Sequence, residues 1–128
     1  MSNKTALVEF IELNKGKLEG LNLTGADLTG ADLTGANLTD VILQDADLTG
    51  VNLKDANLQG TWMFEATLNE VKLLGASLKK AYFTNATLHG VNLQGVDLEG
   101  SYFKGADLTD AKMTDEQREY VVSKGGIL

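Results

Sequence analysis

The sequence contains few of the cysteine, serine and histidine side chains that form nucleophile–base pairs in enzymes. Cysteine is absent, and His89 is the only histidine. The serines are Ser2, Ser77, Ser101 and Ser123. Nucleophilic catalysis needs a hydroxyl or thiol group within hydrogen-bond reach of a base, and no such constellation emerges. Ser101 and Thr61 are better explained as small core-lining residues, so we expect a protein that is not an enzyme.

Acidic and amide side chains recur at a fixed interval and could in principle offer oxygen ligands to a metal ion. Between residues 16 and 115, one position in every five is Asp or Asn in ten of twenty cases. Calcium needs about 6–8 oxygen ligands that converge on one point, whereas evenly spaced side chains on a regular structure do not converge. The glycines recur at the same interval, which marks turns and not a phosphate-binding loop. We expect no metal site and no cofactor.

A five-residue repeat runs from Gly16 to Asp115 without an insertion or a deletion, and representative units are ADLTG, ANLQG and VNLQG. The third residue of each of the twenty units is Leu, Met or Phe. The first residue is Ala or Val except at Gly16, Leu21, Thr61 and Ser101. The fifth residue is glycine in eleven units. The repeat therefore specifies two apolar positions and one turn position in every unit.

The period of five fits neither an α-helix, with about 3.6 residues per turn, nor a flat strand, with a period of about 2. Positions one and three of a unit have the same parity, so both point to one side of a short extended segment. The glycine-rich fifth position supplies a turn, because glycine tolerates a positive φ. Coils built in this way must stack, since no unit can bury its own leucine. The repeat predicts an all-β solenoid.

The pattern A(D/N)LxG resembles the pentapeptide-repeat family, and the resemblance covers residues 16–115. It implies a right-handed quadrilateral β-helix with four units in each 20-residue coil. It also implies that the first and third residues point inward and the others outward. Twenty units would make about five coils, and a stacking distance of about 4.8 Å gives a shaft about 24 Å tall.

The two ends of the repeat are expected to carry caps, because an open solenoid end would expose core and unpaired backbone. Residues 1–15 form the expected N-terminal cap, either as a short amphipathic helix over 3–14 or as an irregular first coil. Thr114 and Gln117 have the spacing of a capping box, which predicts a helix to about Ser123, stopped by the glycines at 125 and 126. The expected organisation is one domain with a cap at 1–15, a shaft at 16–115, and a capping helix and tail at 116–128.

Composition and charge narrow the class of protein further. The apolar stretch near the N-terminus is broken by Glu9 and Glu12, unlike a signal peptide. No run approaches the roughly 20 apolar residues of a membrane-spanning helix. The net charge is −7, which disfavours direct contact with nucleic-acid phosphates. Together with the absence of cysteine, these features lead us to expect a cytoplasmic protein that binds neither membrane nor nucleic acid directly.

If positions 20 residues apart lie above one another, one face of the shaft is aromatic. Its outward residues include Ile42, Trp62, Phe64, Tyr82 and Tyr102. One interpretation is a ladder of stacked rings that stabilises the shaft, with about 0.5–1.5 kcal/mol per aromatic pair beyond burial. The other is a partner-binding surface, because Trp and Tyr are enriched at binding hot spots. The unit TWMFE at 61–65 departs most from the repeat, so we place any partner site there.

A second face is acidic. It carries Asp27, Asp47, Glu70, Asp107 and Asp110 and no basic residue of its own repeat units. One interpretation is a solvated face that keeps the protein soluble, and the other is mimicry of nucleic acid. We also expect His89 on this face, next to Glu70 and Asp110 of the adjacent coils.

The resemblance gives the mimicry hypothesis a specific form. Some pentapeptide-repeat proteins protect DNA gyrase from quinolones with an acidic rod that looks like a DNA duplex. Those proteins look longer and dimeric, whereas this chain offers about five coils. Five acids along about 24 Å also fall below the duplex density of one charge per roughly 1.7 Å.

The sequence therefore predicts a non-catalytic scaffold or protein-interaction module with a protein partner. One alternative is an inhibitor or protector of a DNA-handling enzyme such as gyrase, acting through the acidic face. Another alternative is a purely structural protein.

Overall fold

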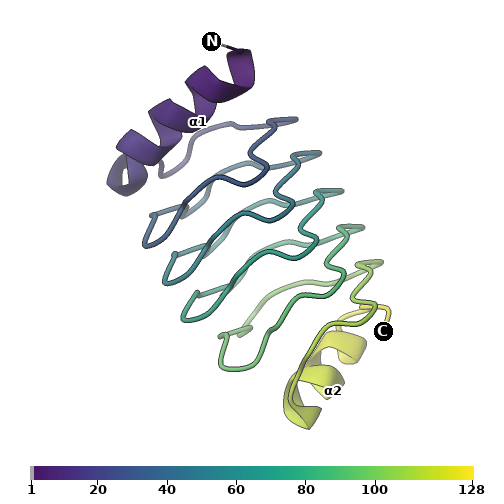
Figure 1. Ribbon diagram of the computed structural model, residues 1–128. Coiled ribbons are helices and arrows are strands. Elements are labelled where there is room, and N and C mark those ends of the chain that lie inside the picture. The colour runs from purple at the N-terminus through teal and green to yellow at the C-terminus, as the bar shows by residue number, and fades with distance from the viewer. Residues whose placement is uncertain (1) are drawn as a thin grey trace.

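The computed structural model describes residues 2–128 and shows a stack of coils between two helices (Figure 1). The helices are α1 (Asn3–Leu13) at the N-terminal end and α2 (Asp115–Ser123) at the other end. A short 3-10 helix, η1 (Lys15–Lys17), joins α1 to the first coil. The helices therefore lie where caps were expected, and the repeat forms the shaft between them.

Parallel β-bridges join second-position residues that are 20 apart in sequence, so each coil contains four pentapeptide units. On the aromatic face, bridges link Asn22, Ile42, Trp62, Tyr82 and Tyr102 in that order. All of these bridges are isolated, and no strand longer than a single bridge is assigned within residues 2–128. The four faces are the aromatic face (21–25 and every twentieth residue after), the acidic face (26–30 onward), the third face (31–35 onward) and the fourth face (16–20 onward). The expected stacked β-solenoid with 20-residue coils is confirmed at this level.

The core is a column of first- and third-position side chains. Every one of these residues from Leu28 to Leu108 is buried, which confirms the inward assignment. Thr61 and Ser101 are fully buried as well. Their hydroxyl groups donate to the carbonyl oxygens of Leu58 (2.9 Å) and Leu98 (2.5 Å). These two polar residues therefore pack as small core-lining residues, because the backbone three residues earlier satisfies each hydroxyl group.

The backbone turns at the fifth position of each unit. Every fifth residue from Gly20 to Asp110 has a positive φ, between 57° and 76°. Eight of these residues are not glycine, among them Asp40 and Lys80. The turn expected from the glycine bias is confirmed, and the coil geometry imposes it even where the sequence has no glycine.

The N-terminal cap is a helix and not an irregular coil. The Ser2 hydroxyl accepts a hydrogen bond from the Thr5 N–H (3.1 Å) at the start of α1, and Ile11 is fully buried against the first coil. Phe10 and Leu13 are 53% and 84% exposed, so part of the apolar face expected to lie inward faces solvent instead.

The C-terminal cap combines the predicted helix with a β-bridge that was not predicted. The capping box is confirmed, with Gln117 N–H donating to Thr114 Oγ1 (3.1 Å). The helix starts at Asp115, one residue before the expected boundary. After the helix, Ile127 pairs with Asp107 as a further parallel bridge, so the tail adds one rung to the acidic face.

The ladder of bridges is interrupted inside the third face. Asn52 pairs with Lys72, and Asn92 pairs with Lys112. Within the described residues Lys72 and Asn92 form no bridge with each other, although they are 20 residues apart and hold equivalent positions. Separately, none of the helices in residues 2–128 has the length and apolar character needed to span a bilayer.

Candidate functional site

The aromatic face carries a continuous row of rings over three coils. Trp62 meets Phe64 edge to face, with ring centroids 6.4 Å apart. Phe64 stacks on Tyr82 at 5.7 Å, and Tyr82 stacks on Tyr102 at 4.9 Å with an interplanar angle of 6°. Phe64, a fourth-position residue, therefore inserts between two second-position rings and links them along the shaft.

The outer rings remain partly open to solvent. Trp62 is 46% exposed and Tyr102 is 47% exposed, while Ile42, Phe64 and Tyr82 are half-buried. The structure thus brings together all five residues that the sequence placed on this face, in one row. Stacking explains the half-buried rings, but it leaves about half of the Trp62 side chain without a protein neighbour.

A second pair of rings lies beneath this row, inside the shaft. Phe83 and Phe103 are fully buried and stack at 5.1 Å with an interplanar angle of 7°. These third-position residues take the place of leucine in the core, so aromatic packing continues from the surface of this face into the core. A rigid row of rings presents contact area with little loss of side-chain entropy on binding.

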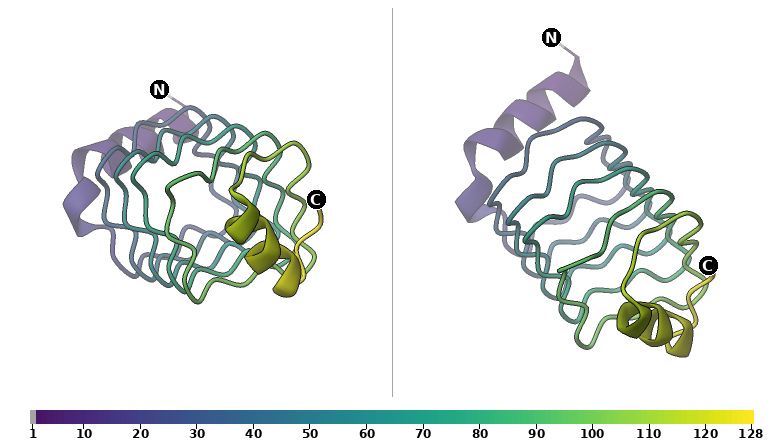
Figure 2. Two further views of the ribbon diagram at one scale, coloured as in Figure 1. Left: turned by 90° about the horizontal axis from the view of Figure 1, so that it is seen from below. Right: turned by 60° about the horizontal axis from the view of Figure 1, so that its bottom comes forward.

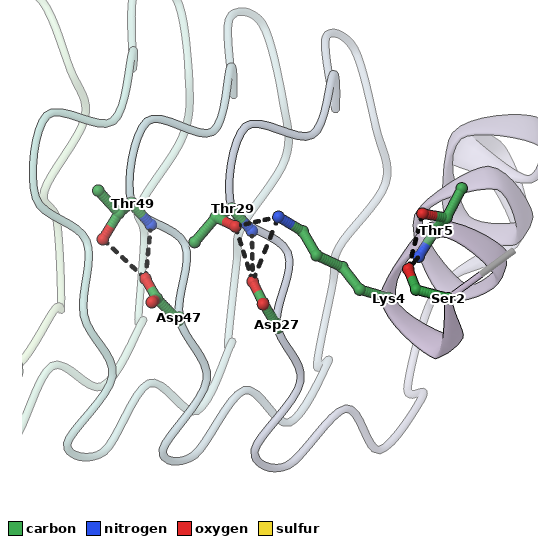
Figure 3. A network of polar contacts seen from close by, with 7 residues as sticks. All are labelled: Ser2, Lys4, Thr5, Asp27, Thr29, Asp47 and Thr49. Carbon is green, nitrogen blue, oxygen red and sulfur yellow. Dashed lines mark hydrogen bonds and ion pairs between the residues drawn. The ribbon is translucent and has the colours of Figure 1, made fainter.

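The acidic face is held by hydrogen bonds between aspartate and threonine of the same unit. Asp47 Oδ1 accepts from the Thr49 N–H (3.0 Å) and the Thr49 hydroxyl (2.7 Å). Asp27 and Thr29 repeat both contacts one coil earlier (Figure 3). The Asp–x–Thr spacing therefore forms an Asx-type turn that fixes each carboxylate against its own backbone.

A lysine from outside the repeat reaches this face. Lys4, on α1, pairs with Asp27 at 3.8 Å and also donates to the Thr29 hydroxyl (Figure 3). The Thr29 hydrogen bonds, and then Lys4, hold the pKa of Asp27 below its ordinary value. The face was expected to hold no basic residue of its own units, which is correct, but the cap supplies one at its end.

His89 contacts a different carboxylate from the two that were expected. Its Nε2 lies 2.7 Å from Asp107 Oδ2. The Glu70 N–H donates to His89 O at 3.1 Å, but among the described residues neither the Glu70 nor the Asp110 carboxylate is hydrogen bonded to His89. Both latter residues occupy fifth-position turns with positive φ, which direct their side chains away from the second-position row. His89, followed by Thr109, lowers the pKa of Asp107 to about 2.

No group of three or more His, Cys, Asp or Glu residues suited to a metal ion occurs in residues 2–128. The hydroxyl groups of Thr61 and Ser101 are buried and bonded to backbone, so neither is placed as a nucleophile. The aromatic face presents a row of stacked rings, and the acidic face presents a row of carboxylates that are hydrogen bonded to threonine.

The interruption of the third face was not foreseen. The register predicts hydrogen bonds from Leu73 N–H to Asn92 O and from Asn92 N–H to Val71 O, and neither is present among the described residues. A cleft of about 420 Å³ lies there, and Leu74 beside it is 68% exposed. The only sequence signal was Leu74 itself, an apolar residue at an outward position.

The repeat matches a known protein family and several solved structures. The family model for pentapeptide repeats matches eight copies, over residues 12–45, 31–69, 63–100 and 81–115. A pentapeptide repeat protein from the Arabidopsis thaliana thylakoid lumen, solved by crystallography, is 31% identical. That match covers 84% of this chain and 78% of that chain, with a TM-score of 0.51. The search of curated proteins found no match.

Two cyanobacterial structures are also similar. HetL from Nostoc, a pentapeptide repeat protein involved in heterocyst differentiation regulation, is 32% identical; the match covers 77% of this chain and 53% of HetL, with a TM-score of 0.31. A pentapeptide repeat protein from Cyanothece is 26% identical over 86% of this chain and 99% of that chain, with a TM-score of 0.32.

Proposed function

The chain belongs to the pentapeptide repeat family, and from that premise we propose that it is a non-catalytic interaction module whose aromatic face binds a partner protein. The observation that supports this most is the row from Trp62 to Tyr102, in which stacking orders the rings and still leaves Trp62 and Tyr102 about half exposed. Ordered, half-exposed aromatic side chains are the usual anchors of protein interfaces.

The acidic face gives weaker support to the alternative of nucleic-acid mimicry. Asp27, Asp47 and Asp107 are each bonded to the threonine two residues later. Asp27 is further paired with Lys4, and Asp107 with His89. Carboxylates already bonded within the chain must give up or share those contacts to bind a partner. We therefore keep the acidic face as a solvated surface.

The right-handed sense of the coils and a cytoplasmic location remain part of this proposal. The crystallised relative from Arabidopsis comes from the thylakoid lumen, so membership of the family does not by itself place this chain in the cytoplasm. If the following experiment captures no partner protein, the result would favour a purely structural role.

The test is affinity capture from a lysate of the source cell, with three forms of the full chain. Trp62→Ala,Tyr82→Ala removes two rings of the row. Thr67→Ala,Thr87→Ala is the matched control, because these residues are bridged to each other at the same position of the same coils, on the acidic face. We expect one set of proteins to be captured by wild type and by the threonine variant, and to be lost with the aromatic variant.

Thermal unfolding of all three forms must accompany the capture, because loss of ring stacking costs about 0.5–1.5 kcal/mol per pair. If the aromatic variant is folded at the capture temperature and still retains the partners, the aromatic face is packing only. Loss of the partners with the threonine variant alone would move the binding surface to the acidic face.

A further inference from the structure

The fourth face ends in an open backbone edge at Val96–Gly100. One coil earlier, the N–H groups of Leu78 and Lys80 donate to the carbonyl oxygens of Asp97 and Glu99, both at 2.9 Å. Leu98 and Gly100 hold the same positions in the last unit of this face. Within residues 2–128 neither of their N–H groups has an acceptor, because the chain that would continue the ladder forms α2 instead.

The aromatic and acidic faces are closed at this end by the tail. Gly105 N–H donates to Gly125 O at 3.0 Å, and Leu108 N–H donates to Ile127 O at 2.8 Å. Figure 2 (left) looks at this end and shows α2 lying across one side of the coil. The tail thus supplies a rung to the aromatic and acidic faces, and the fourth face receives none.

A cleft of about 470 Å³ separates this edge from the first turns of α2. Its apolar floor is formed by Val96 and Leu98, which are each 6% exposed, whereas Leu78 directly above is fully buried. Tyr120 of α2 also lines the cleft. Gln117 donates to Val96 O at 3.2 Å, so one backbone acceptor of the edge is already occupied and two donors are free.

The negative charge of the cleft favours a basic partner. Asp97, Glu99 and Glu116 line it, and no lysine or arginine is among the lining residues. Lys79 of the coil above pairs with Asp97 at 3.4 Å, which leaves two acids without a basic partner in the cleft wall. A second copy of the chain would bring the same acids to its own edge, and like charges in contact cost several kcal/mol.

We propose that this cleft binds an extended basic segment of a partner protein as an added β-strand. Two carbonyl groups of the segment, two residues apart, accept the N–H groups of Leu98 and Gly100, as Asp97 and Glu99 do for the coil above. An apolar side chain of the segment covers Val96 and Leu98, and its lysine or arginine residues face Glu99 and Glu116. This is strand addition at a sheet edge, in which backbone bonds give affinity and side chains give specificity.

The probe is a blocked hexapeptide of alternating lysine and valine, added to the ¹⁵N-labelled full chain. We expect the amide protons of Leu98 and Gly100 to move downfield and to exchange with solvent at least about tenfold more slowly, since each becomes a hydrogen-bond donor. The amide of Gly105, which is already bonded to Gly125, is the internal control and should change little. A peptide of alternating glutamate and valine should not bind.

Charge variants separate this cleft from the rest of the surface. Glu99→Lys,Glu116→Lys should weaken the lysine peptide by at least about tenfold. Glu65→Lys,Glu70→Lys makes the same change of charge on other faces and should bind as wild type does. Trp62→Ala,Tyr82→Ala should also bind normally, so a failure here and a failure of the aromatic-face proposal can be told apart.

Three results would overturn the proposal. The first is no binding of the lysine peptide. The second is binding that is lost in salt and leaves the Leu98 and Gly100 amides unprotected, which would be charge attraction without strand addition. The third is protection of these amides by self-association of the chain in the absence of peptide.

Discussion

The fifth residue of each unit from Gly20 to Asp110 adopts a positive φ, and the corner side chains of adjacent coils must pack against one another in this conformation. At two corners a glycine lies next to an aspartate of the preceding coil: Asp40 lies over Gly60, and Asp55 lies over Gly75. A Cβ on Gly60 would be 2.3 Å from Asp40 Oδ1, and one on Gly75 would be 2.1 Å from Asp55 Oδ1. Glycine therefore serves two purposes at these corners, turning the chain and leaving room for the aspartate.

Gly60→Ala should be more destabilising than Gly30→Ala. Both glycines have a φ of 72°, but nothing lies within 4 Å of a Cβ at Gly30. The positive φ costs about 1–2 kcal/mol at each site. Displacing the Asp40 side chain from its rotamer adds about 0.5–1.5 kcal/mol at Gly60 only. Denaturant unfolding measures both, and the extra cost should vanish in an Asp40→Ala background; its persistence there would contradict this explanation.

Leu68→Ala should cost about 2–5 kcal/mol, because a fully packed third-position side chain leaves a cavity. Leu68 is 1% exposed. Thr67→Ala is the control from the same unit, since its side chain points outward, and it should change the unfolding free energy by less than about 0.5 kcal/mol. Equal effects of the two substitutions in chemical denaturation would mean that the inward and outward positions are misassigned.

The pKa of Asp107 should rise in His89→Ala. The carboxylate is held at a pKa of about 2, first by His89 and then by Thr109, against an ordinary value of 3.8. Because the folded-state pKa is depressed, this carboxylate stabilises the fold above about pH 3.8, and the contribution is lost as the pH falls toward 2. In the variant an NMR titration should give a pKa between these values, since Thr109 remains. An unchanged pKa would show that His89 is not the main cause.

At the level of elements, the ladder of β-bridges joins successive coils, and within residues 2–128 its internal interruption lies on the third face, between Lys72 and Asn92. Leu53 N–H donates to Lys72 O at 2.8 Å, and Leu93 N–H donates to Lys112 O at 2.8 Å. Leu73, which lies between these two in the same column, has no such bond within residues 2–128. The third face should therefore open locally at a lower free energy than the other faces.

Native-state hydrogen exchange tests this directly. The amides of Leu73 and Asn92 should exchange faster than those of Leu53 and Lys72, which hold the same positions one coil earlier and are hydrogen bonded. A difference of tenfold or more corresponds to about 1.4 kcal/mol in the free energy of opening. Equal protection at all four amides would mean that the ladder is continuous in solution.

The repeat was sufficient to predict the coil, its register and the residues that line it, because one period accounts for burial and turn together. It did not predict details that depend on contacts between distant residues. Phe10 and Leu13 fit an amphipathic helix, yet the orientation of α1 on the first coil leaves them exposed. Ile127 lies 20 residues after Asp107 and so keeps the coil register, but the helix between them hides that spacing.

The aromatic and acidic faces could also be predicted from the repeat, but the side-chain contacts within them could not. Stacking every twentieth residue placed Trp62 and Tyr82 on one face, where they lie. The sequence could not show that Phe64 would insert between them, because that depends on a side-chain rotamer. Nor could it show that Lys4 would reach Asp27, since Lys4 lies outside the repeat.

For the whole molecule, the shaft is a rigid support with four differently decorated sides and two capped ends. Two sides have now been given roles that can be separated. We propose that the aromatic face binds a partner protein and that the edge of the fourth face binds an extended segment as an added strand.

The central claim is that the aromatic face is where a partner protein touches this chain. Site-specific photo-crosslinking in source cells tests it most directly, with p-benzoyl-phenylalanine placed singly at Tyr102, at Thr87 on the acidic face, or at Gln94 on the third face. We expect a discrete cross-linked product from position 102 and none from positions 87 or 94. A product of equal or greater yield from position 87 or 94, with none from position 102, would contradict it.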